Sequence, residues 1–470
     1  MTPEASPTTG TVGPRGARGL MLLALYLLAF CLSVLDSIDH DKPPAGDAAQ
    51  YLALAYNLHR YWVFSHEEEK DGALPAPSAY REPGYPAILA LCILMSPRLQ
   101  EMRMAELFQQ DLQPRLWPFK AMQAVLLLAA SFVAMAIVRQ VTGHRLLSWL
   151  ALALVGLDGT LQAANNVLLS EPLIVLLLSA FTLCAINVAR SGTYLHFAAA
   201  GVMLGLLALT RASFLYLGIA AAALLAGLAY RMPRHRRRLN TGLAVALFCA
   251  LGLVAPWMAR NAIQLGRVFL TERGGTILTI RAELNTMTAR EYMAAFLYWT
   301  NSPFLRYRLL PELFGEGAAD RLGAGGPEDL GQIARRRRQQ VYEEVRSRPQ
   351  ADGALQHEAL ARILRHPIRH MAVTLPVAYR GIFVARTAAL SFGLWMSLFV
   401  TLWLGLRRRD APMLAAVLPA LACFAFHALV THNIPRYNFI AIPALWVSLL
   451  LVLHELGGMR DWPKPGSDPH

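Results

Sequence analysis

The polar residues that could do chemistry stand where long apolar runs of this sequence end. Asp47 lies in a polar stretch, residues 36–86, that follows the first apolar run. Glu171 lies in the turn sequence NNVLLSEP, and Arg211 and Arg436 are single arginines in other short turns. A carboxylate can take a proton from an attacking hydroxyl, and arginines can bind a phosphate leaving group. Brought to one face of a membrane, these residues would suit group transfer from a lipid phosphate.

Further candidates accompany these four residues. Arg260 is a third candidate for phosphate binding, in the sequence PWMARNAIQLG. Candidate substrate contacts come from the 36–86 stretch, from the same PWMARNAIQLG segment and from the last turn, and they are Tyr51, Arg81, Glu82, Tyr85, Asn261 and His432.

Each candidate also has a structural explanation. Asp47 could cap the helix that follows it, with Gln50 at the capping-box position. Glu171 could simply begin a helix, where a carboxylate suits the helix dipole. Arg211 and Arg436 could bind phospholipid headgroups, and Arg260 could anchor its helix at the membrane interface.

A bound metal has little support in the sequence. The acidic cluster of Asp36, Asp39, His40 and Asp41 could hold a divalent ion, but it lacks a recognisable ligand spacing. The five cysteines all lie in apolar runs without a CxxC pair, which predicts neither a disulfide framework nor a zinc site. We therefore assign no metal ligand and no cofactor, and metal dependence stays open.

The composition is that of a multi-pass membrane protein. The 470 residues are 55% hydrophobic and only 16% charged, with a mean hydropathy of +0.37, whereas soluble domains are about 25% charged. The net charge of +13 reflects basic cytoplasmic loops rather than nucleic-acid binding, because such loops are rich in Lys and Arg.

The apolar runs predict an all-α fold with about ten membrane-spanning helices. They lie near 18–36, 118–138, 146–164, 168–189, 194–210, 213–230, 239–258, 388–406, 411–431 and 437–455. The third is interrupted by Gly156, Asp158 and Gly159. Two more apolar stretches, 83–97 and 370–386, are interpreted as helices that lie at the membrane interface, with spanning of the membrane as the alternative.

The distribution of basic residues predicts the orientation. With the N-terminus in the cytoplasm, the short outside turns carry only Arg211 and Arg436. The short inside segments carry all of the following: Arg15, Arg18, Arg139, Arg145, Arg190, five arginines among 231–238, Arg407 to Arg409, Arg460 and Lys464. This asymmetry places both termini inside and all the candidate residues at the outer face.

The predicted organisation follows from this topology. Residues 1–17 form a disordered cytoplasmic tail, and residues 18–258 form an N-terminal membrane module with a periplasmic loop at 37–117. Residues 259–387 form a second periplasmic segment with interfacial helices. Residues 388–456 hold the C-terminal membrane helices, and residues 457–470 are a cytoplasmic tail.

The sequence resembles the GT-C superfamily of polytopic glycosyltransferases, in the group of protein mannosyltransferases and lipid A aminoarabinose or galacturonic acid transferases. The matching motifs are GDAAQYLALAYNL, YREPGYPAILAL, LLSEPLIVLLL, GLLALTRASFLYL, APWMARNAIQLGRVFL and PRYNFIAIPAL, in the family's order. The resemblance implies a sugar donor on polyprenyl phosphate, use at the periplasmic face of a bacterial inner membrane, and inversion at the anomeric carbon.

The resemblance also implies residue roles. Asp47 matches the catalytic aspartate of the first loop, and Glu171 matches the acidic position of the second outside turn. Arg211, Arg260 and Arg436 match basic positions near the carrier phosphate. Some members have two adjacent acidic residues in the first loop, whereas this chain has only Asp47 between Gly46 and Ala48.

Two other functions compete with transfer to an envelope acceptor, which could be lipid A, another glycan or a protein. A lipid-carrier flippase or transporter would more often show paired halves and helices interrupted at the midplane. A non-catalytic assembly subunit could use the large outer segment for contacts. Substitution of Asp47 separates these alternatives, since a scaffold should tolerate it.

Overall fold

The computed structural model describes residues 14–37, 44, 46–69, 72–108, 116–323, 325–345 and 348–457. These residues form helices joined by loops, with no β-strand among them, as the sequence predicts. Helix α1 (Pro14–Ser37) begins inside the stretch 1–17 that we expected to be disordered. Residues 1–13 and most of the C-terminal tail, 458–470, lie outside the described residues.

Nine helical stretches in the described part of the chain are long and apolar enough to cross a membrane. They comprise α1, α5 (Trp117–Thr142), α6 (Arg145–Gly156) with α7 (Gly159–Ala164), α8 (Glu171–Arg190), α10 (Phe214–Arg231), α11 (Arg236–Leu265), α18 (Ala388–Arg408), α19 (Ala411–Val430) and the 3₁₀ turn η6 (Pro435–Ala441) with α20 (Ile442–Leu456). The tenth expected helix, α9 (Tyr194–Thr210), has 17 residues and is also apolar.

The two ambiguous stretches form shorter helices. Helix α3 (Gly84–Leu94) has 11 residues, which span about 16 Å and cannot cross a bilayer core of about 30 Å. Helix α17 (Pro367–Gly381) contains Pro376 and is not among the candidate spans. Their position at the membrane interface stays a prediction.

The predicted interruption of the third span is confirmed, and its cause is visible. Asp158 caps α7, because its carboxylate accepts hydrogen bonds from the Thr160 and Leu161 amides at 2.9 and 3.0 Å. Trp446 of α20 donates a hydrogen bond to the other carboxylate oxygen at 2.9 Å. The break is therefore a fixed turn that delivers the chain to the loop before Glu171.

The first loop is built into the membrane bundle. Helix α2 (Asp47–Tyr61) packs against α3, and their buried side chains, including Leu52 and Leu89, join one hydrophobic core with the membrane helices. Helix α8 lies at the centre of that bundle and contacts α5, α9 and α19. Asp47 at the start of α2 is therefore carried by a packed element rather than by a free loop.

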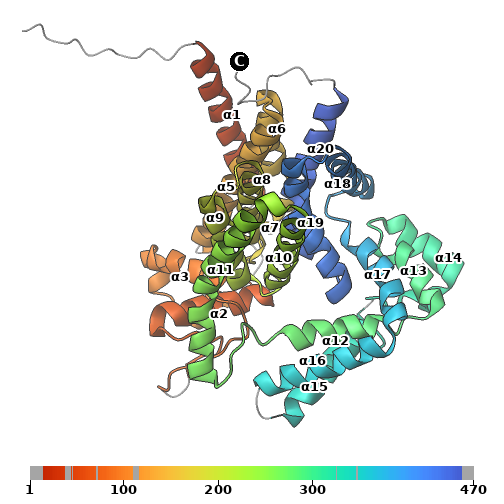
Figure 1. Cartoon of the computed structure of the whole chain (residues 1–470). Coiled ribbons are helices and arrows are strands. Elements are labelled where there is room, and N and C mark those ends of the chain that lie inside the picture. Colours follow the sequence, from red (N-terminus) through yellow and green to blue (C-terminus); the bar gives the residue numbers. More distant parts are fainter. Residues whose placement is uncertain are drawn as a thin grey trace, which may run out of the picture.

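The outer segment forms a second helical group with its own core. It comprises α12 (Gly274–Leu284), α13 (Ala289–Trp299), α14 (Leu310–Phe314), α15 (Leu330–Glu344), α16 (Arg348–Arg365) and α17. Trp299, Leu310 and Val377 are buried in this core. Figure 1 shows this group beside the membrane bundle, with α12, α15 and α16 stacked together.

Candidate active site

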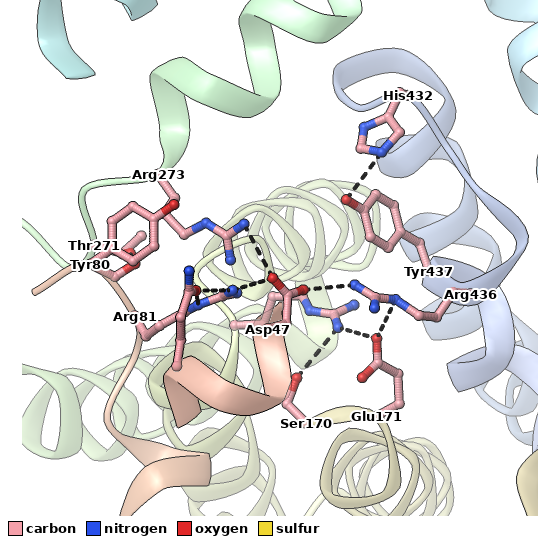
Figure 2. Close-up of polar contacts among 12 residues, drawn as sticks. Asp47, Tyr80, Arg81, Ser170, Glu171, Thr271, Arg273, His432, Arg436 and Tyr437 are labelled. Atoms are coloured by element: carbon pink, nitrogen blue, oxygen red, sulfur yellow. Dashed lines mark hydrogen bonds and ion pairs between the residues drawn. The ribbon is translucent and has the colours of Figure 1, made fainter. Parts of the chain in front are cut away.

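Asp47 lies at the centre of a cluster of arginines. It is the first residue of α2, after Gly46 with φ 57°, and no side-chain hydrogen bond caps this helix. Its carboxylate instead contacts Arg81, lies 2.9 Å from Arg436 Nη2 and 3.9 Å from Arg273 Nη2 (Figure 2). The structural alternative, in which Asp47 is only a helix cap, is therefore wrong, because Gly46 is the N-cap.

Arg81 holds the Asp47 carboxylate from one side. Its side chain is only 3% exposed, and its Nε donates to Gln50 Oε1 at 2.9 Å. Its guanidinium lies 4.8 Å from the Tyr51 ring centroid. Because Gln50 and Tyr51 belong to α2 as Asp47 does, this helix and Arg81 form one rigid unit.

Tyr51 and Tyr85 pack together in the buried core next to this unit. Their rings meet edge-to-face at 5.0 Å, and both are buried. The Tyr85 hydroxyl donates to Gln123 Oε1 on α5 at 2.8 Å. Both residues were predicted as substrate contacts, whereas their observed contacts are with protein side chains that position α2.

Glu171 forms the second half of the cluster. It is the first residue of α8 and is 3% exposed, and Arg211 Nη2 lies 3.0 Å from its Oε1. Arg436 Nε lies 3.4 Å from the same oxygen, so Arg436 bridges the Asp47 and Glu171 carboxylates. The two predicted catalytic carboxylates and two of the three predicted phosphate-binding arginines therefore meet at one place.

Glu82 lies beside this cluster, and its observed hydrogen bond is with the backbone. Its Oε1 accepts a hydrogen bond from the Ala212 amide at 2.8 Å, directly after Arg211. Burial raises the Glu82 pKa, while that hydrogen bond and the Arg81 charge oppose the rise. Glu82 was predicted to bind substrate, and its observed contact fixes the Arg211 turn.

Arg260 and Asn261 lie at the end of α11 and contact other groups. Arg260 donates to the Ser78 carbonyl at 2.8 Å and to Asn261 Oδ1 at 2.9 Å, and it lies 4.9 Å from the Trp257 ring. Asn261 donates to the Phe269 carbonyl at 2.9 Å. Among the described residues, neither is joined to Asp47 or Glu171 by a hydrogen bond or ion pair, so these contacts join α11 to the loops around it.

His432 lies at the edge of the cluster, beside Tyr437 (Figure 2). Its Nε2 is 3.5 Å from the Tyr437 hydroxyl. Burial, with the charges of Arg380 and Arg436, lowers the His432 pKa to about 3. His432 is therefore neutral at physiological pH and can act as a hydrogen-bonding group rather than a cation.

Two residues at the site were missed from the sequence. Arg273 is the residue before α12, and its guanidinium lies 5.3 Å from the Tyr80 ring as well as near Asp47. The centroid of the Tyr437 ring lies 5.8 Å from Cζ of the Arg211 guanidinium. Tyr437 directly follows Arg436 in the sequence, so proximity could have identified it. Arg273 had no such signal, because it lies in a long outer segment rich in arginine.

The cluster carries an excess of positive charge. In these ion pairs, four guanidinium groups (Arg81, Arg211, Arg273 and Arg436) face two carboxylates. Arg211 Nη1 and Arg273 Nε are buried and have no hydrogen-bond partner among the described residues. Burial raises the Asp47 pKa, but Arg81 and Arg436 outweigh it and leave that pKa below its ordinary value. The site can therefore accept an anion beside an ionised carboxylate.

A metal site is not apparent in the described part of the chain, where no three His, Cys, Asp or Glu residues are grouped to hold an ion. Asp36 is exposed at the end of α1. Asp39, His40 and Asp41 lie outside the described residues, so the proposed acidic cluster stays a prediction.

Comparison with known proteins identifies the fold. No family model and no curated protein matches the sequence. The structure of ArnT from Cupriavidus metallidurans in the apo state aligns over 93% of this chain and 60% of its own length, with 13% identity and a TM-score of 0.51. The oligosaccharyltransferase AglB from Archaeoglobus fulgidus, in complex with an inhibitory peptide and a dolichol-phosphate, aligns over 96% of this chain and 53% of its own, with 16% identity and a TM-score of 0.49.

The ArnT alignment shows a shared fold, and the predicted all-α polytopic membrane architecture is confirmed. This chain spans about half the length of AglB and 60% of ArnT. At these identities, the likeness reaches the arrangement of the helices and no further.

Proposed function

We propose that this multi-pass membrane protein is a glycosyltransferase that moves a sugar from a polyprenyl-phosphate donor to an envelope acceptor. The observation that carries this proposal is the pairing of Asp47 with three arginines, two of which, Arg273 and Arg436, are partly exposed. The fold shared with ArnT also supports the proposed glycosyl transfer.

The arginines suit the leaving group of that reaction. When a sugar leaves a lipid phosphate, negative charge develops on the phosphate oxygens and needs cationic stabilisation. Arg211, Arg273 and Arg436 offer guanidinium groups around one point, and Arg211 and Arg273 each have a buried N–H without a partner. We assign these three residues to the carrier phosphate, and we leave Arg260 with its observed contacts to the Ser78 carbonyl and Asn261.

Asp47 suits the base of the reaction. Because its carboxylate is ionised in the free protein, it can accept a proton from the acceptor hydroxyl as that oxygen attacks the anomeric carbon. The low pKa makes it a weak base while Arg81 and Arg436 offset its charge. A phosphate that draws Arg436 toward itself would raise the Asp47 pKa at the moment when the base is needed.

Glu171 suits a positioning role in this scheme. Its carboxylate is 3% exposed and holds Arg211 and Arg436 at 3.0 and 3.4 Å. A single displacement, with the base and the leaving phosphate on opposite sides of the sugar, inverts the anomeric centre. The charge asymmetry of the loops supports a site at the periplasmic face of a bacterial inner membrane.

The test is a comparison of envelope chemistry in strains that lack and carry the gene. Mass spectrometry of lipid A, other glycans and glycoproteins from a deletion strain should reveal one missing sugar, and the wild-type gene should restore it. Asp47→Asn, present at the same level in the membrane, should not restore it. Restoration by Asp47→Asn would refute the catalytic proposal and favour a scaffold or a lipid-carrier transporter.

A further inference from the structure

We propose that a cleft between α12, α15 and α16 binds an acidic oligosaccharide and forms the remote part of the acceptor site. This inference rests on the proposed glycosyl transfer and names the class of its acceptor. One arginine of the sequence run Arg335–Arg338, Arg337, lines this cleft.

The cleft has the size of a ligand site and a mostly charged lining. Its volume is about 600 Å³, within the range of about 300–1,000 Å³ that is common for small-molecule sites. It is lined by Glu283, Ile333, Arg337, Glu358, Ala361, Arg362 and Arg365. Most of these side chains are charged, which suits a ligand covered with hydroxyl and acidic groups.

Two ion pairs hold the polar lining in place. Arg362 pairs with Glu283 through two N–H groups, the second at 3.0 Å, and Arg337 pairs with Glu358. Each guanidinium has five N–H donors and each carboxylate has about four acceptor sites. Most of them remain available after one pairing, so the cleft presents fixed donors and acceptors to sugar hydroxyls.

The charge balance favours an acidic sugar over a neutral one. The lining contains three arginines and two glutamates. Arg365 is exposed and forms no ion pair with any residue that the structure describes. On α16 it lies one turn beyond Arg362, on the face that also carries Glu358. A carboxylate or phosphate on the ligand would give Arg365 its missing counter-charge.

Helix α12 connects the cleft to the catalytic cluster. Arg273, directly before α12, faces Asp47, and Glu283 near the other end of α12 lines the cleft. These positions are ten residues apart, which is about 15 Å along a helix. Asp352 of α16 accepts the Gly275 amide at 3.1 Å and so fixes the two helices together.

The separation implies an extended acceptor. One end would present the reacting hydroxyl to Asp47, and an acidic unit farther along would occupy the cleft. Binding energy gained at the remote unit can then orient the hydroxyl for attack, so a truncated acceptor would lose turnover as well as affinity.

The experiment measures binding of trigalacturonic acid to the detergent-purified full chain by calorimetry, with neutral maltotriose as the control ligand. We expect saturable binding of the acidic trisaccharide and at least tenfold weaker binding by R337Q/R365Q. The matched control is R336Q, because Arg336 is the exposed neighbour of Arg337, contacts the Pro327 carbonyl and does not line the cleft. R336Q should bind as the wild type does.

The inference would be overturned by equal weakening by R336Q, by equal binding of maltotriose, or by the absence of saturable binding. The alternative of a lipid-headgroup site is tested with the same variants. Native mass spectrometry measures how much phosphatidylglycerol each variant retains. If R337Q/R365Q loses the lipid but keeps the trisaccharide, the cleft binds headgroups and the proposal fails. Asp47→Asn should keep trisaccharide binding, so failure of the cleft and failure of the catalytic proposal are distinguishable.

Discussion

Replacement of Asp47 by Asn removes the proposed base with little change in shape. General-base catalysis contributes roughly 10²–10⁴ to a rate, so sugar transfer should fall by about that factor. Initial rates can be measured with lipid-linked donors extracted from wild-type membranes and with the deletion-strain envelope as acceptor. Asp47→Glu keeps the charge but moves it by one methylene, and it should retain part of the activity.

The stability cost of Asp47→Asn can be bounded from the ion pairs. Arg81 is 3% exposed, whereas Asp47 is 28% exposed. Loss of one partner of a fully buried pair costs about 3–5 kcal/mol, and loss of an exposed pair costs about 1 kcal/mol or less. Because Arg81 keeps its hydrogen bond to Gln50 Oε1 at 2.9 Å, we expect Asp47→Asn to lower the free energy of unfolding by about 1–2 kcal/mol. The variant should remain folded, with a melting temperature a few degrees lower.

A matched control isolates catalysis from charge. Glu68 is an exposed carboxylate in the same loop, and Glu68→Gln makes the same chemical change without touching the cluster. It should leave the transfer rate within a factor of two of wild type. If Asp47→Asn transfers sugar at half the wild-type rate or better, Asp47 is not the base, and Glu171 becomes the candidate.

The pH dependence gives a second check on Asp47. Burial raises its pKa, but Arg81 and Arg436 depress it further, so the pKa in the folded protein lies below the ordinary value of about 3.9. A depressed carboxylate pKa contributes stability above the unfolded pKa and loses it as the pH falls through the folded pKa. Because Asp47 is then ionised throughout the range from pH 5 to 7, the free enzyme should show no acid limb in kcat/KM in that range. A limb there that disappears in Asp47→Asn would contradict the assigned ion pairs.

The remaining predictions concern the carrier phosphate, the packing of the first loop and the topology. Arg211→Ala should weaken donor binding by about 10–150-fold, as loss of a charge-assisted hydrogen bond costs about 1.5–3 kcal/mol, and Arg211→Lys should restore it only partly; unchanged affinity would remove Arg211 from the phosphate site. Gly84→Ala should destabilise the protein by about 1–3 kcal/mol, because its added Cβ would lie 2.8–2.9 Å from atoms of α9, whereas Gly252→Ala, with open space around it, should not lower the melting temperature. Cysteines placed at the exposed positions Glu68 and Glu328 should react with an impermeant maleimide from the periplasm, and protection of both would reverse the proposed orientation.

The sequence predicted the membrane helices well because apolar runs and their basic flanks report directly on the bilayer. The break near Asp158 and the turn at Arg211 were visible for the same reason. The start of α1 was placed too late, since helix formation there extends to Pro14 and does not depend on apolar residues alone. Ser78 lies in a polar part of the sequence, yet it is only 8% exposed, because the first loop packs into the bundle.

The site could be predicted in part, because it draws on turns that topology alone brings together. Asp47, Glu171, Arg211 and Arg436 belong to that set, and they do meet. Arg273 could not be identified, because its approach to Asp47 depends on the path of the loop that joins α11 to α12. The contacts of individual side chains were also beyond the sequence, and the observed hydrogen bonds of Glu82, Tyr85 and Arg260 are with other protein groups.

The ion pairs of the cluster have a consequence for how this protein could diverge. Their residues come from segments that precede α12 or follow α19, and among the described residues none comes from α12 to α17. The outer helical group also has a hydrophobic core of its own. Residues 282–370 of this group can therefore accumulate substitutions, or be exchanged, while every residue of these ion pairs is kept. In a chimaera, residues 282–370 of this chain are replaced by those of a related chain. It should keep the donor preference of this chain and take the acceptor preference of the related chain.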